Sequence, residues 1–124
     1  PPRSTLLPST TLFRSELALK TLEARGLKLL ARNYSCPLGE LDLVLLDQGS
    51  LVVVEVRYRR DGSRGSAAET VGPEKRRKLT RATEHFLRSH ADLRRKPLRF
   101  DVAAVTGEGE ALAVEWIQDA FQPG

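Results

Sequence analysis

The stretch ELDLVLLDQGSLVVVEVRY, residues 40–58, decides how this chain folds. It contains two runs rich in Val and Leu, Glu40 to Leu46 and Leu51 to Tyr58, with the polar segment Asp47 to Ser50 between them. Two such runs around a glycine-bearing turn are typical of a β-hairpin. The sequence therefore predicts two antiparallel strands joined by a tight turn.

The turn also predicts the register of this hairpin. With Asp47 paired to Ser50 across a two-residue turn, counting back along both strands places Asp42 opposite Glu55. The other face of the hairpin then carries only apolar side chains, namely Leu41, Leu43, Leu45, Val52, Val54 and Val56. A slip by one residue would put the acids on that apolar face, so the pattern itself supports the register.

Two carboxylates directly opposite each other on one face of a sheet lie about 5 Å apart and repel each other. One of them must then take a proton, or a cation must lie between them. Mg²⁺ is commonly held by one or two carboxylates together with water and substrate phosphate. Asp42 and Glu55 are therefore a candidate Mg²⁺ site, and a charge cluster on a solvated sheet face is the alternative.

Arg57 extends this candidate site along the second strand. It lies on the same face as Glu55, about 6–7 Å further along, and the count places Glu40 opposite it. Its guanidinium is therefore within reach of a phosphate held by the cation. Glu55 and Arg57 also interrupt a run that reads as a buried central strand, where a charge without a partner is costly.

The rest of the sequence predicts one α/β domain with a central mixed β-sheet flanked by helices, in the order α-β-β-β-α-β-β. Beyond the hairpin, the expected elements are a helix over Glu16–Arg25, a strand over Leu27–Asn33, a loop over Tyr34–Gly39, a helix over Pro73–His90, and strands over Leu98–Val105 and Leu112–Ile117. Residues 1–15 are rich in Pro, Ser and Thr and follow neither helical nor strand periodicity. We expect them to be a disordered or non-native tail, with the domain spanning residues 16–124.

The composition narrows the functional classes. The chain has 124 residues and a formal net charge of +4, a balance compatible with a polyanionic partner such as nucleic acid. It contains no apolar run of the roughly 18 residues that a membrane span needs, so no membrane association is expected. Its single cysteine, Cys36, excludes an intrachain disulfide and favours the reducing cytoplasm. We interpret this cysteine as an inert loop residue.

Several separated motifs resemble one family, the YraN-like uncharacterised bacterial proteins. They are Gly39-Glu40-Leu41-Asp42-Leu43-Val44, Val54-Glu55-Val56-Arg57-Tyr58-Arg59, Arg99-Phe100-Asp101-Val102 and Val114-Glu115-Trp116-Ile117 with Asp119-Ala120-Phe121. The resemblance covers Glu16 to Phe121. It implies the restriction-endonuclease-like fold, which is similar to that of archaeal Holliday-junction resolvases and transfer-RNA splicing endonucleases.

The resemblance also implies roles for individual residues. Asp42 and Glu55 would be metal ligands, the carbonyl of Val56 a third oxygen, and Arg57 would stand where related nucleases carry Lys. An Arg stays protonated and cannot act as a base, but it can hold a phosphate. The acid that such nucleases often place on the first helix falls at Ser15, and Glu16 would point about 100° away around the helix.

The basic residues complete the candidate site. The nucleic-acid-binding candidates are Arg57, Arg59, Arg60, Arg64, Lys75, Arg77 and Lys78. A solvated helix face is the alternative interpretation for those in the second helix. Asp101 is expected to pair with Arg99 or with a loop Arg, and Trp116 to pack in the core or on the sheet.

Together these features predict an endonuclease that requires Mg²⁺, with Mn²⁺ as an alternative, and that cleaves a phosphodiester by attack of a metal-activated water. DNA is expected as the substrate in preference to RNA, and branched DNA is one candidate. The second hypothesis is a nucleic-acid-binding protein of nuclease-like fold with weak or no catalysis. The third is a structural protein whose acids form a surface network. Formation of a homodimer is left open.

Overall fold

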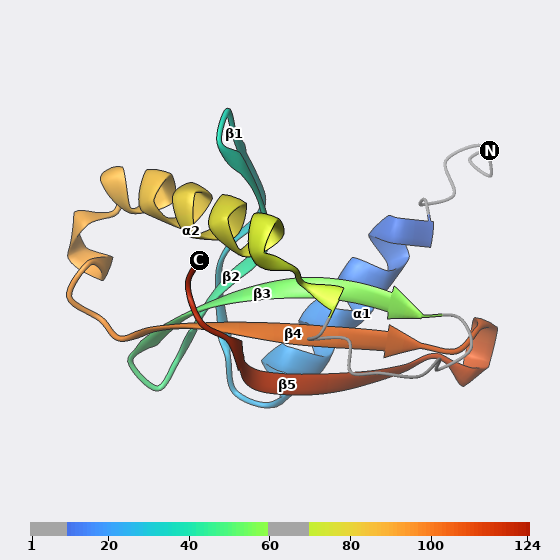
Figure 1. The fold of residues 1–124 in the computed structure, drawn as a ribbon. Coiled ribbons are helices and arrows are strands. Elements are labelled where there is room, and N and C mark those ends of the chain that lie inside the picture. The colour runs from blue at the N-terminus through green and yellow to red at the C-terminus, as the bar shows by residue number, and fades with distance from the viewer. Residues whose placement is uncertain (1–9, 60–69) are drawn as a thin grey trace, which may run out of the picture.

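Five strands and two helices make up the fold (Figure 1). The computed structural model describes residues 10–59 and 70–124. Its elements are α1 (Thr10–Ala24), β1 (Lys28–Cys36), β2 (Gly39–Asp47), β3 (Ser50–Arg59), α2 (Pro73–Arg88), the 3₁₀ turn η3 (Ala91–Leu93), β4 (Leu98–Thr106), the 3₁₀ turn η4 (Gly109–Ala111) and β5 (Ala113–Phe121). The predicted single α/β domain and the element order α-β-β-β-α-β-β are confirmed.

The strands lie in one mixed sheet in their chain order, β1-β2-β3-β4-β5. All neighbouring strands are antiparallel except β3 and β4, which are parallel. A parallel pair requires a crossover connection, and α2 lies in the segment between these two strands. This crossover brings the first turn of α2 beside β3, close to the residues of the predicted acidic site.

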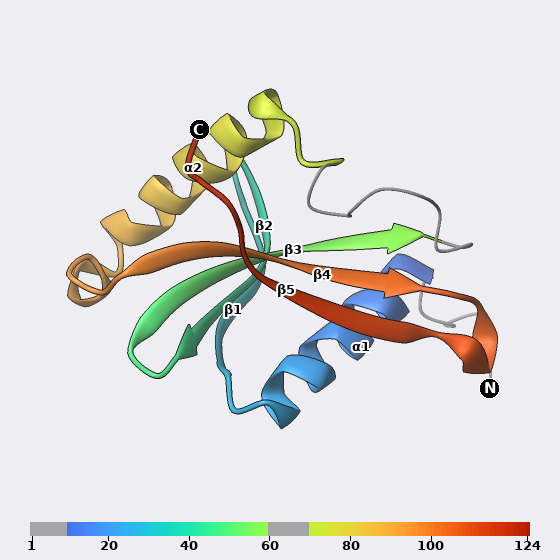
Figure 2. The same ribbon diagram turned by 60° about the horizontal axis from the view of Figure 1, so that its bottom comes forward.

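The two helices cover opposite faces of the sheet (Figure 2). On the α1 face, Val52 and Val54 pack with the apolar side of that helix. On the α2 face, Leu51 and Val53 pack with the apolar side of α2. A strand that is buried on both faces reads as a continuous apolar run, which explains the Val-rich sequence at the start of β3.

The predicted register of the β2–β3 hairpin is confirmed, because Asp47 pairs with Ser50. The ladder ends at the pair Leu43 and Val54, one position before the two acids. Beyond this point β2 continues with β1, and that hairpin rises beside α2 (Figure 1). Gly39 at its tip has a φ of +154°, and a Cβ there would lie 3.2 Å from the carbonyl oxygen of Lys78 in α2.

This change of direction corrects one prediction about the hairpin. Leu41 does not share the α1 face with Leu43 and Leu45, but is buried in the core beneath α2. The expected loop over Tyr34–Gly39 is also wrong, since β1 extends to Cys36 and only Pro37 and Leu38 form the turn. Alternation along a strand predicts faces only while the strand stays in the same ladder.

The first helix begins earlier than expected. It starts at Thr10 instead of Glu16, so the expected boundary at Ser15 falls inside α1. Residues 10–15 are helical and not a disordered tail, whereas residues 1–9 lie outside the described part of the chain. No helix in the ranges 10–59 and 70–124 is long and apolar enough to cross a membrane.

Candidate metal and phosphate site

Glu55 is the centre of the candidate site. It follows Leu51 and Val53 in the row of β3 side chains that faces α2, and only 6% of its surface is exposed. Beyond Glu55 the strand becomes partly exposed, so this residue lies at the edge of the core. The carboxylate is therefore buried on one side and close to solvent on the other.

Asp42 occupies the point where β2 leaves β3. The ladder ends at Leu43, so the next β3 amide on that side has no strand partner from β2. The N–H of Val56 donates instead to Oδ2 of Asp42, at 2.9 Å. Asp42 thus caps the end of the ladder beside Glu55.

The two carboxylates interact electrostatically. Burial and, after it, the neighbouring charge of Asp42 raise the pKa of Glu55 from its usual value to about 7. The predicted pairing of Asp42 with Glu55 is not among the ladder pairs, which end at Leu43 and Val54, although the two side chains interact. The predicted pairing of Glu40 with Arg57 is not among the ladder pairs, since Glu40 is exposed and pairs with Ser35 of β1.

Two cations contact Glu55, and both contact the same oxygen. Nη2 of Arg57 and Nζ of Lys75 each lie 3.5 Å from its Oε2. Both cations lower the pKa of Glu55, against the effects of burial and of Asp42. Lys75 lies in the first turn of α2, and its contact with Glu55 makes it part of the acidic site.

Two buried polar atoms of this site have no hydrogen-bond partner in the described part of the chain: Oε1 of Glu55 and Nε of Arg57. Buried polar groups in folded proteins nearly always have a partner. One of these atoms is an acceptor and the other is a donor. A divalent cation at the carboxylate oxygen and a phosphate oxygen at the guanidinium nitrogen would satisfy both.

The donor set fits a cation that shares its coordination with substrate and water. No group of three or more His, Cys, Asp or Glu that could hold a metal occurs among the described residues. Asp42 and Glu55 provide two carboxylates, which is the usual number for Mg²⁺ bound with a phosphate. The described residues do not fit Zn²⁺, whose protein sites use three or four ligands that are mostly Cys and His.

The other predicted ligands stay predictions. The structure shows a contact of the Val56 amide with Asp42, and the role predicted for the Val56 carbonyl is untested. Ser15, at the place of the helix acid, is buried in α1 with 8% of its surface exposed. Glu16 binds Arg32 at 2.8 Å, with 43% of its side chain exposed.

The remaining basic candidates are spread over β3 and α2. Arg77 is exposed and lies 3.6 Å from Glu74 on the same helix, and Lys78 is exposed one residue further on. Arg59 is the last residue of β3, and Arg60 and Arg64 lie outside the described residues. The structure thus gives Arg57 and Lys75 a direct contact with Glu55 of the acidic pair.

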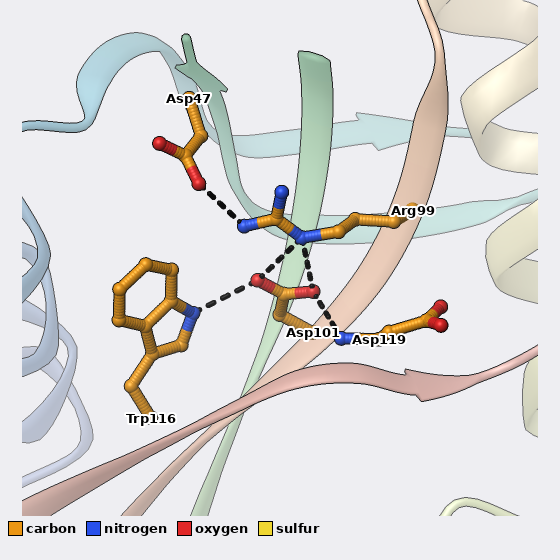
Figure 3. A network of polar contacts seen from close by, with 5 residues as sticks. All are labelled: Asp47, Arg99, Asp101, Trp116 and Asp119. Carbon is orange, nitrogen blue, oxygen red and sulfur yellow. Dashed lines mark hydrogen bonds and ion pairs between the residues drawn. The ribbon is translucent and has the colours of Figure 1, made fainter.

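A second polar network has a structural role (Figure 3). The fully buried carboxylate of Asp101 accepts hydrogen bonds from Nε of Arg99, Nε1 of Trp116 and the backbone N–H of Asp119. Nη2 of Arg99 also binds Asp47 at 2.7 Å. The predicted pairing of Asp101 with Arg99 is confirmed. Trp116 packs beside the α1-side core, and its indole N–H ties β5 to β4.

Comparison with known proteins places the chain in a family. Residues 15–105 match the family described as "Uncharacterised protein family UPF0102". The chain belongs to this family. It is 46% identical over 107 residues to a UPF0102 protein of Nitrosococcus oceani, with 86% of each chain covered. It is 49% identical over 106 residues to one of Stutzerimonas stutzeri, covering 86% of this chain and 88% of the relative.

A UPF0102 protein of Xylella fastidiosa is 50% identical over 105 residues, with 85% of each chain covered. The family match includes Asp42, Glu55, Arg57 and Lys75. The predicted resemblance to the YraN-like uncharacterised bacterial family is confirmed. The family description names no activity, so the chemistry of the site has to be argued from its geometry.

Proposed function

We propose that this UPF0102 chain is an endonuclease that uses Mg²⁺, or Mn²⁺, to hydrolyse a phosphodiester of nucleic acid, with DNA as the expected substrate. The observation that carries the proposal is the pair of unpartnered buried atoms, Oε1 of Glu55 and Nε of Arg57. The two atoms do not pair with each other, because Arg57 contacts Glu55 through Nη2 and Oε2 instead. A metal ion together with a phosphate supplies both.

Each protein residue of the site would have a separate role. Asp42 and Glu55 hold the cation between two carboxylates that otherwise repel each other. Arg57 donates to a non-bridging phosphate oxygen and fixes the scissile group against the cation. When bound, Mg²⁺ supplies Lewis-acid stabilisation of the developing charge and a nucleophilic water at neutral pH.

The basic side chains of α2 support a polyanionic substrate. Arg77 and Lys78 are exposed on the helix whose first turn carries Lys75. Phosphates along a nucleic-acid strand bind such residues with release of counterions, whatever the base sequence. The site is therefore expected to contact the phosphate backbone of the nucleic acid and to obtain its specificity from the shape of the substrate.

A nucleic-acid-binding protein with little catalysis is the second candidate. One observation favours it: Arg57 stands beside Glu55 where it can hold phosphate, but a guanidinium cannot accept a proton from water. In that case metal and phosphate would bind at the same residues without cleavage. The two candidates differ only in turnover, so one assay separates them.

The test is cleavage of labelled branched and linear DNA by the full chain with and without Mg²⁺ or Mn²⁺. Wild type should cleave only with metal, and both Asp42→Asn and Glu55→Gln should reduce the rate at least about 10²-fold because the charge on the phosphate is no longer stabilised. Glu40→Gln, an exposed acid on the same strand, is the control and should leave the rate unchanged. Salt-sensitive binding without cleavage would favour the second candidate, and neither binding nor cleavage would refute both.

A further inference from the structure

Lys75 reaches the acidic site from outside the hairpin. It lies in the first turn of α2, and its Nζ lies 3.5 Å from Oε2 of Glu55. Its side chain is 40% exposed, whereas that of Glu55 is 7% exposed. The ammonium group therefore stands at the boundary between the buried carboxylate and the solvent from which a substrate would arrive.

The two cations of the site differ in what they can still bind. Arg57 uses Nη2 for Glu55, and its Nε is buried. An ammonium group has three N–H donors on a flexible stem, and the one partner shown for Lys75 in the described residues is Glu55. Lys75 thus retains donors that can turn toward a small group at the solvent side, whereas Nε of Arg57, which has no partner in the described part of the chain, is buried and is fixed in the plane of its guanidinium.

The distribution of contacts over Glu55 places Lys75 next to the proposed cation. Both protein cations contact Oε2, and Oε1 has no partner in the described residues. A metal bound at Oε1 and the ammonium at Oε2 would then flank one carboxylate group. A water molecule held by the metal on that side would lie within reach of the Lys75 donors.

We propose that Lys75 is the residue that positions the attacking water of the phosphodiester hydrolysis, an inference that rests on the proposed function. Lys75 donates a hydrogen bond to the water oxygen and remains an ammonium ion throughout. The water oxygen forms the new bond to phosphorus, the bond to the leaving oxygen breaks, and the water proton passes to bulk solvent, which also protonates the leaving oxygen. Arg57 holds the phosphate, and Lys75 holds the nucleophile.

The experiment compares Lys75→Gln, Lys75→Arg and the control Lys20→Gln, which removes an exposed Lys from α1. Single-turnover cleavage of labelled DNA is measured at saturating protein, and DNA affinity is measured separately with Ca²⁺ in place of Mg²⁺. Lys75→Gln should lower the single-turnover rate about 10²-fold, the effect of losing one positioned donor, with a much smaller loss of affinity. Lys75→Arg keeps a charged donor and should retain most of the rate, and Lys20→Gln should leave both the rate and the affinity unchanged.

A second readout needs no cleavage: Mn²⁺ binding to wild type and to Lys75→Gln without nucleic acid. Removing a positive charge beside Glu55 should leave Mn²⁺ affinity unchanged or increase it. A residue that merely held the site together would, on removal, weaken Mn²⁺ binding and cleavage together, and that result would overturn the inference.

Different results would refute the role of Lys75 and the proposed nuclease function. If wild type cleaves and Lys75→Gln cleaves at the same rate, the role of Lys75 is refuted and the proposed function stands. If wild type does not cleave with either metal, the proposed function is refuted and the role of Lys75 with it.

Discussion

A single buried carboxylate explains most of the chemistry that this chain offers. Glu55 is 6% exposed, yet it lies beside another acid and beside two cations that both contact only one of its oxygens. The protein therefore stabilises the ionised carboxylate incompletely. Such an imbalance makes Glu55 a candidate functional group.

The titration of Glu55 gives a direct prediction for stability. Its pKa is about 7 in the folded protein and 4.5 in the reference state, so the folded state binds the proton more tightly. Both states are protonated below about pH 4.5, and the free energy of unfolding should fall as the pH rises from there to about 7. Glu55→Gln removes this dependence, so at pH 8 it should be more stable than wild type by about 2 kcal/mol, after allowance for its lost ion pairs.

Denaturant unfolding of wild type and Glu55→Gln between pH 4 and pH 8 measures this difference. Adding Mg²⁺ at pH 8 should stabilise wild type and leave Glu55→Gln unchanged, because ligand binding to the folded state alone raises its stability. A Glu55→Gln variant less stable than wild type at pH 8 would show that the carboxylate is held by its neighbours and serves the fold.

Asp101 is the opposite case, a buried carboxylate whose contacts are satisfied. Three donors reach it, from Arg99, Trp116 and Asp119. Asp101→Ala should lower the free energy of unfolding by about 3–5 kcal/mol, because the guanidinium loses its buried partner. Asp47→Ala removes the more exposed partner of the same Arg99 and is expected to cost about 1 kcal/mol. Thermal or urea unfolding compares the two, and equal losses would contradict the structural role of Asp101.

Much of this site could be predicted at the level of residues. Alternation and the two-residue turn are local properties, and together they predict that Asp42, Glu55 and Arg57 lie close to one another. The contact of Lys75 with Glu55 could not be predicted in this way. It depends on the position of the first turn of α2 relative to β3, and no spacing within the sequence encodes that position.

At the level of elements, the β2–β3 hairpin and α2 build the site together. The predicted bounds of β3 and α2 differ from the observed ones by at most two residues. The turn at Gly49 and the residue Pro73 mark clearly where these two elements begin. The early start of α1 and the extended β1 were missed. β1 continues to Cys36 because it pairs with β2, and in α1 Arg14 lies over the ring of Tyr58 in β3. Both are contacts with other elements, which the local sequence pattern does not encode.

The exposed side of α2 leads to a prediction for nucleic-acid binding. Arg77→Gln and Lys78→Gln should each weaken DNA binding to a similar extent whatever the base sequence. Each should also reduce the slope of log affinity against log salt by about 1, because one phosphate contact is lost. Fluorescence anisotropy over a range of NaCl concentrations measures both quantities.

Arg95→Gln is a suitable control for this series. Arg95 is exposed beyond η3, at the end of α2 distant from Lys75. Its removal should leave the slope unchanged. If all three variants lower the slope alike, the binding surface is not organised around the acidic site.

At the scale of the whole molecule, the fold places a charged group at the edge of a doubly covered sheet. Leu51 and Val53 of β3 face α2, Val52 and Val54 face α1, and from Val56 onward the strand is partly exposed. A carboxylate at this point is buried enough to need a partner and still close to solvent. The relatives at 46–50% identity match most of this chain, so the same framework is expected in them.

Asp42 and Glu55 are proposed to form one divalent-cation site, and Mn²⁺ binding followed by electron paramagnetic resonance measures whether they do. Wild type should bind one Mn²⁺, with tighter binding when a short DNA duplex is present, because its phosphate completes the coordination. Glu55→Gln and Asp42→Asn should each abolish this site, and Glu40→Gln should retain it. Equal Mn²⁺ binding by all four proteins, or no saturable site in wild type with DNA, would contradict the account.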